Sequence, residues 1–136
     1  MELYLSIAIG GALGALTRYG ISTFYEANYS SLIPWGTMLA NLIGSFLIGM
    51  IFIILQDRFQ QNESLRGLLI IGFLGAMTTF SSFSLEALLL LQRGNYTYAI
   101  GYILFSVVFC LLATLLGMHF TRSWICLLYT SPSPRD

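Results

Sequence analysis

The stretch GAMTTFSSFSLE, residues 75–86, places polar side chains inside a long apolar segment. Phe80 and Phe83 alternate with hydroxyl side chains and are followed within a turn by the carboxylate of Glu86. The hydroxyls belong to Thr78, Thr79, Ser81, Ser82 and Ser84. Such side chains bond to nearby backbone groups and compete with helical hydrogen bonding. We therefore expect two half-helices joined by a break near Met77 to Phe80, although hydroxyls that bond back to their own helix are an alternative.

A break of this kind would have chemical consequences in a membrane. Irregular backbone is tolerated at membrane depth only where protein or a water-filled cavity covers it. The break also leaves free carbonyls on the first half-helix and free amides on the second, which are natural sites for a cation and an anion respectively.

The composition of the whole chain agrees with a membrane environment. Of its 136 residues, 57% are hydrophobic and 9% are charged, too few to cover a soluble domain. A helix needs about 20 apolar residues to cross a bilayer, and four segments qualify, at residues 3–25, 34–56, 65–92 and 96–120. The sequence thus predicts an all-α membrane protein with four transmembrane helices, the third broken at mid-membrane. We expect residues 1–122 to form this single domain and residues 123–136, which contain Pro132 and Pro134, to form a disordered or non-native tail.

Several function classes are excluded by the same composition. The net charge is zero and lysine is absent, so no basic face for nucleic acid exists. Cys110 and Cys126 form no metal-ligand cluster, and no phosphate-binding loop or dinucleotide fingerprint occurs. The sequence therefore indicates a protein that is not an enzyme.

Polar residues recur at helical spacing in the second and fourth segments. In the second segment, Thr37, Asn41 and Ser45 lie on one face. In the fourth, steps of four residues join Tyr98, Tyr102, Ser106, Cys110 and Thr114. These stripes predict donors along an ion path, and interhelical hydrogen bonding is the alternative. In the first segment, Gly10, Gly11, Gly14 and Ala15 predict a close helix-packing face.

The distribution of arginine bears on membrane orientation. Four spans place Arg58, Arg66 and Arg122 on one side and Arg18 and Arg93 nearer the other, which is almost no bias. The positive-inside rule then fixes no orientation. The chain could insert in both directions in lipid and pair with itself as an antiparallel, dual-topology homodimer, and so small a unit needs a partner to enclose a path.

Three motifs resemble those of the Fluc (CrcB) family of fluoride channels. They are GGALGALTRY at 10–19, GTMLANLIGSFLIG at 36–49 and GFLGAMTTFSSFS at 72–84, and the resemblance covers residues 3–120 in order. It implies a fluoride-selective channel in the bacterial plasma membrane that lets fluoride leave passively and relieves its toxicity. Family members are antiparallel homodimers with a structural sodium ion at the centre.

The resemblance also implies roles for individual residues. It assigns the pore to Asn41, Phe80, Phe83, Ser81, Thr37, Tyr102, Ser106 and Thr114. The electropositive edges of the two phenyl rings would face fluoride. Backbone carbonyls of Gly75 and Thr78 from both subunits would hold Na⁺, and Arg18 and Glu86 would lie at a vestibule or interface.

Two other functions are compatible with a small four-span protein. The first is a small dual-topology multidrug exporter, which needs a deeply embedded carboxylate to exchange protons for cationic drugs. Glu86 is the one carboxylate well within a predicted span, and it comes late in the third. The second is a non-transporting assembly subunit, which would give no ion flux in purified form.

Overall fold

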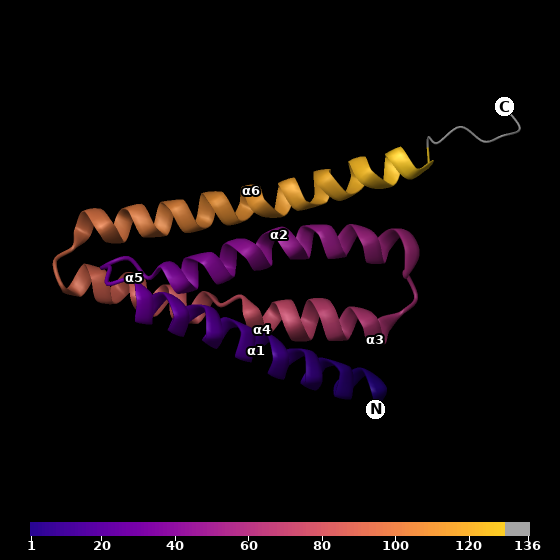
Figure 1. Ribbon diagram of the computed structural model, residues 1–136, viewed down its shortest axis with the longest axis horizontal. Helices are drawn as coiled ribbons and strands as arrows, with labels where there is room; N and C mark the ends of the chain where they lie inside the picture. Colours follow the sequence, from indigo (N-terminus) through magenta and orange to yellow (C-terminus); the bar gives the residue numbers. More distant parts are fainter. Residues whose placement is uncertain (130–136) are drawn as a thin grey trace, which may run out of the picture.

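Long helices that run side by side make up the computed structural model, which describes residues 1–129 (Figure 1). The elements are α1 (Glu2–Asn28), α2 (Trp35–Arg58), α3 (Glu63–Arg66), η1 (Gly67–Leu74), α4 (Gly75–Met77), α5 (Phe80–Gln92) and α6 (Tyr96–Tyr129). No strand occurs within these residues, which confirms the all-α prediction. The start of α1 lies at the same end of the bundle as α3 and the last turns of α6 (Figure 1).

Three stretches are long and apolar enough to cross a membrane, namely Trp35–Arg58, Glu63–Gln92 and Tyr96–Leu128. The helix α1 is also long enough, at 27 residues, but it carries Glu2, Arg18 and Glu26 and is not among them. The structure therefore shows an all-helical protein with three candidate membrane spans in the described chain.

The last helix is longer than the sequence indicated. We expected the fourth span to end near residue 120 and a tail to begin at 123, whereas α6 continues to Tyr129. Residues 123–129 are thus helical, since no proline or glycine occurs before Pro132 to interrupt the backbone. The rest of the expected tail, residues 130–136, lies outside the described residues.

Glycines allow close contact between neighbouring helices. A Cβ atom added at Gly10 or Gly14 of α1 would meet backbone carbonyl oxygens of η1, those of Leu68 and Phe73 respectively. The predicted packing face of α1 thus lies against η1, with Gly10 and Gly14 at the contact. The residues of η1 form a π-helix, a rare widened helix that is often found near functional sites.

A matched pair of glycines in α6 tests the importance of close packing. A Cβ at Gly117 would meet the carbonyl oxygen of Phe46 in α2, whereas nothing lies within 4 Å of one at Gly101. We expect Gly117→Ala to destabilise the protein by about 1–3 kcal/mol, because overpacking forces the helices apart. Gly101→Ala should leave stability nearly unchanged. Thermal unfolding in detergent measures both, and equal unfolding temperatures would contradict the packing described here.

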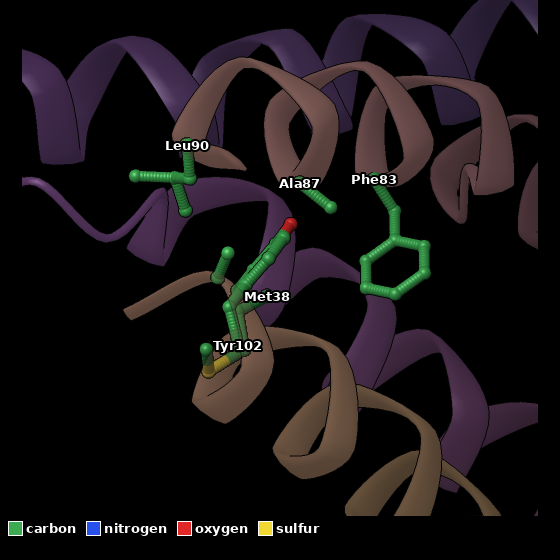
Figure 2. Close-up of a cluster of buried hydrophobic side chains, with 6 residues drawn as sticks. Met38, Phe83, Ala87, Leu90 and Tyr102 are labelled. Atoms are coloured by element: carbon green, nitrogen blue, oxygen red, sulfur yellow. The ribbon is translucent and has the colours of Figure 1, made fainter. Parts of the chain in front are cut away.

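The core that positions the candidate site lies where α2, α5 and α6 meet. Met38, Phe83, Ala87, Leu90, Ala99 and Tyr102 are the buried members of this cluster (Figure 2). Tyr102 is only 1% exposed, and its ring centroid lies 5.2 Å from that of Phe83. The aromatic ring of Tyr102 is thus held by packing, which fixes where its hydroxyl group can reach.

Candidate functional site

The helical backbone is interrupted at two threonines. The helix α4 ends at Met77, Thr78 has φ −87° and ψ 151°, Thr79 has φ −150° and ψ 123°, and α5 begins at Phe80. The Thr79 hydroxyl oxygen accepts a hydrogen bond from the amide of Ser82 at 3.3 Å and so caps the start of α5. This is the usual role of threonine at a helix N-cap. The local sequence therefore ends one helix and begins the next.

Asn41 of α2 holds the interruption in place. Its side-chain amide donates to the carbonyl oxygen of Thr79 at 3.1 Å, and its Oδ1 accepts from the Thr79 amide at 2.7 Å. The side chain thus satisfies both backbone groups of one residue, as a neighbouring strand would. Since an amide nitrogen carries two hydrogens, one donor of Asn41 remains.

The interruption also leaves backbone carbonyls without their helical donors. In a continuous α-helix, the amides of Thr79 and Ser82 would bond to the carbonyls of Gly75 and Thr78. Here the Thr79 amide donates to Asn41, and the Ser82 amide donates to the Thr79 hydroxyl. Oxygen atoms of unwound backbone are typical ligands of alkali cations in membrane proteins. The carbonyls of Gly75 and Thr78 therefore offer two oxygen atoms of the kind that bind such a cation.

Arg18 lies at the end of α4. Its Nε donates to the carbonyl oxygen of Ala76 at 3.0 Å, across a sequence separation of 58 residues. A cation at the C-terminal end of a helix is favourable because the carbonyl ends carry partial negative charge. Arg18 thus caps the end of α4, and the structure does not place it in either pocket described below.

A pocket of about 330 Å³ opens beside the interruption. It is lined by Asn41, Ser45, Thr78, Thr79, Phe80, Phe83, Ser106, Val107, Cys110 and Leu111. The hydroxyl oxygen of Ser106 is buried and, among the residues that the structure describes, has no hydrogen-bond partner. Such a group normally binds protein, water or a ligand, because leaving it unsatisfied costs about 1–3 kcal/mol.

Two phenyl rings form part of the wall of this pocket. Phe80 is 76% exposed and Phe83 is 8% exposed, and their ring centroids are 5.5 Å apart. Aromatic rings carry positive charge at their edges, so a ring edge can face an anion without a formal cation. The pocket is lined entirely by uncharged side chains, including hydroxyl, amide and aromatic groups.

Three polar side chains meet near Phe83, whose ring packs against that of Tyr102. The hydroxyl of Thr37 donates to Glu86 Oε1 at 2.7 Å, and the hydroxyl of Tyr102 donates to Glu86 Oε2 at 2.8 Å. Thr37 and Glu86 also line a second pocket of about 240 Å³, together with Glu26 and Arg93. The cluster thus borders the second pocket, and its Tyr102 ring packs against Phe83, which lines the pocket beside the interruption.

The remaining predicted pore residues lie outside both pockets. The Ser81 hydroxyl is 3.1 Å from that of Thr79 and lies at the start of α5. The hydroxyl of Thr114 donates to the carbonyl of Cys110 in its own helix at 3.1 Å. A hydroxyl bonded in this way does not offer its hydrogen to an ion. Residues 1–129 hold no group of three His, Cys, Asp or Glu that could bind a metal ion.

Thr79 lines the pocket beside the interruption but is absent from the site residues predicted from the sequence. It also caps α5 and pairs with Asn41. A threonine immediately before the apolar-aromatic start of a helix is an N-cap signal, so the position was available from the sequence.

Comparison with known proteins finds one family for nearly the whole described chain. The family described as "CrcB-like protein, Camphor Resistance (CrcB)" matches residues 5–118. A "Fluoride-specific ion channel FluC" of Hahella chejuensis is 45% identical over 116 residues, which cover 85% of this chain and 91% of that protein. A protein of the same name from Francisella philomiragia is 48% identical over 122 residues, covering 87% and 93%. A third, from Magnetococcus marinus, is 45% identical over 112 residues, covering 82% and 91%.

Proposed function

Since this chain belongs to the CrcB family, we propose that it is a fluoride-selective ion channel. It is a multi-pass protein of the bacterial inner membrane and not an enzyme. Fluoride moves passively through it, and an inside-negative membrane potential favours the exit of an anion. The channel thereby keeps the fluoride concentration in the cell low and protects the cell.

The observation that carries this proposal is the buried Ser106 hydroxyl without a partner in a pocket of neutral donors. Fluoride is small, strongly hydrated and accepts hydrogen bonds without donating any. A selective pore has to replace its water with several donors in a narrow space. Ser45, Ser106 and the second amide hydrogen of Asn41 supply donors, and the edges of Phe80 and Phe83 supply positive charge.

The polar residues of α2 and α6 continue the proposed path. Ser106 and Tyr102 lie one helical turn apart on α6, and Tyr102 reaches Glu86 and, through it, Thr37 at the second pocket. This order leads from the pocket beside the interruption towards an aqueous vestibule. Ser81 and Thr114 are proposed to contact the ion where a second copy of the chain completes the pore.

The proposed channel has four membrane spans in each of two subunits. The helix α1 crosses the membrane as a fourth span, packed on η1, and the interruption at Thr78 and Thr79 lies near the bilayer centre. Two copies pair in antiparallel, dual-topology fashion, which is supported by the exposed Phe80 at the pocket and by the balanced arginines. A mass of two chains in mild detergent is expected, and a monodisperse single chain that conducts would contradict it.

A sodium ion shared by the two copies is proposed at the interruption. The carbonyls of Gly75 and Thr78 lack helical donors, and Gly75 lies at the exposed surface of the chain. A single chain offers only these two oxygens, so a second copy would complete the coordination. The ion would be structural, holding the two interruptions together.

Purified protein in liposomes tests the proposed function. Vesicles loaded with fluoride or chloride are diluted into a medium without the halide, and an ion electrode follows release. We expect rapid fluoride release and chloride release close to that of empty vesicles. Replacing sodium by N-methylglucamine on both sides should lower the fluoride rate, and an unchanged rate would remove the sodium ion from the proposal. Absence of fluoride release would favour a non-transporting subunit.

The multidrug-exporter alternative is not favoured. Both carboxylate oxygens of Glu86 are engaged by hydroxyl groups, and the relatives reported above carry the name of fluoride channels. An exporter would couple proton uptake to the release of an organic cation, which the same vesicles would show as a drug-induced pH change.

A further inference from the structure

The cluster of Thr37, Glu86 and Tyr102 links the two pockets through side-chain contacts. Phe83 lines the pocket beside the interruption and packs against Tyr102, while Glu86 and Thr37 line the second pocket. Figure 2 shows the Tyr102 side chain rising from α6 towards α5, with its hydroxyl oxygen near Ala87, between Leu90 and Phe83. An ion that passes between the pockets along the polar residues therefore meets this cluster.

The two hydroxyl hydrogens of the cluster cannot be donated to both Glu86 and fluoride. A hydroxyl group carries one hydrogen, and an ionised carboxylate can only accept. The hydroxyls of Thr37 and Tyr102 both donate to Glu86, with oxygen–oxygen distances of 2.7 and 2.8 Å. Neither hydrogen can be donated to fluoride at the same time. Two of the expected pore donors are thus already occupied by an anion that belongs to the protein.

We propose that Glu86 is an internal competitor of fluoride, a carboxylate that holds the hydroxyl hydrogens of Thr37 and Tyr102 until an arriving ion displaces it. The inference rests on the proposed fluoride conduction. Glu86 acts through the two hydroxyls and is therefore a positioning residue. Between ions the carboxylate keeps the two donors satisfied, which avoids the cost of unpaired polar groups in a buried cluster.

The second pocket offers space and a cationic side chain to the displaced carboxylate of Glu86. Glu86 is only half-buried and lines this pocket together with Arg93 from the end of α5 and Glu26 from α1. A carboxylate that leaves the hydroxyls can turn towards the guanidinium of Arg93 and away from Glu26, because opposite charges attract across the pocket. The returning carboxylate also favours release of the ion, because it again accepts the hydrogen bonds of the two hydroxyls.

The replacement Glu86→Gln tests the competition. An amide donates as well as accepts, so Gln at this position can bond to both hydroxyls while releasing one of their two hydrogens. We expect the fluoride concentration at half-maximal flux to fall about tenfold, as one hydrogen bond to an ion becomes available without displacement. Maximal flux should not rise, because a tighter site releases its ion more slowly.

Glu26→Gln is the matched control for charge. Glu26 lines the same pocket, and in the described residues no hydroxyl donates to it. Removing its charge should shift half-saturation by much less than Glu86→Gln does. A second variant, Glu86→Met, keeps a similar side-chain volume and releases both hydrogens, so its half-saturating concentration should be at least as low. Glu86→Met therefore also tests the competition if Glu86→Gln does not fold.

The outcomes separate this inference from the proposed function. A wild-type protein without fluoride flux overturns the proposed function. A conducting wild type whose half-saturation is unchanged in both Glu86 variants, or shifted no more than in Glu26→Gln, overturns the competition. In a Thr37→Val, Tyr102→Phe background no hydrogen remains to release, so Glu86→Gln should shift half-saturation no more than Glu26→Gln there. A full shift in that background also counts against the inference.

Discussion

Asn41→Ala is expected to lower fluoride efflux from liposomes at least about tenfold, the effect of losing about 1.4 kcal/mol. The side chain makes two hydrogen bonds to the backbone of Thr79, at 3.1 and 2.7 Å. Alanine removes both and leaves the amide of Thr79 without a partner, at about 1–3 kcal/mol for a buried group. The extended backbone at the interruption would then be less populated, and the pocket beside it would lose a donor.

Two further variants give this prediction a control and a gradation. Asn41→Asp keeps an acceptor for the Thr79 amide but lacks the donor for its carbonyl, so its efflux should lie nearer the alanine variant than the wild type. Asn28→Ala removes an asparagine that donates to the carbonyl of Phe24 at the exposed end of α1. Efflux through the Asn28 variant should match the wild type. Normal efflux through Asn41→Ala would show that the Thr79 contacts are dispensable.

Phe80→Val is expected to cut fluoride efflux about tenfold or more, which corresponds to one lost interaction of about 1.4 kcal/mol. The Phe80 ring is 76% exposed on the chain, so its truncation removes little packing within one copy. Valine has no aromatic edge to face an anion. The fold should therefore survive while conduction falls, and chloride release should stay at its low level.

Phe83→Val should also lower efflux, but with a stability cost. Phe83 is 8% exposed and packs against Tyr102, so truncation leaves a cavity in the core at about 3 kcal/mol. The matched control is Phe24→Val, since Phe24 is exposed near the end of α1 and lines neither pocket. Undiminished fluoride efflux in both Phe80→Val and Phe83→Val would remove the phenyl rings from the pore.

Much of the fold followed from local chemistry. Long apolar segments with few charges have one stable form in lipid, the helix, because every backbone group must be paired internally. The hydroxyl-rich residues 78–84 predict an interruption from their own bonding habits, and the extended backbone of Thr78 and Thr79 lies in that stretch. The π-helix of η1 had no such local signal in the sequence. Its widened turns lie where α1 packs closely against η1.

The residues alone were enough to predict the helical class, three candidate membrane spans and the kinds of side chain near the interruption. The partners of these side chains followed only from the packing of the helices. Asn41 pairs with Thr79, Arg18 with Ala76, and Glu86 with hydroxyls from both α2 and α6, all across long sequence separations. The physical reason is that helix rotation and packing set these contacts. Steps of four residues drift around a helix, so Tyr102 reaches Glu86 while Thr114, on the same stripe, bonds to its own backbone.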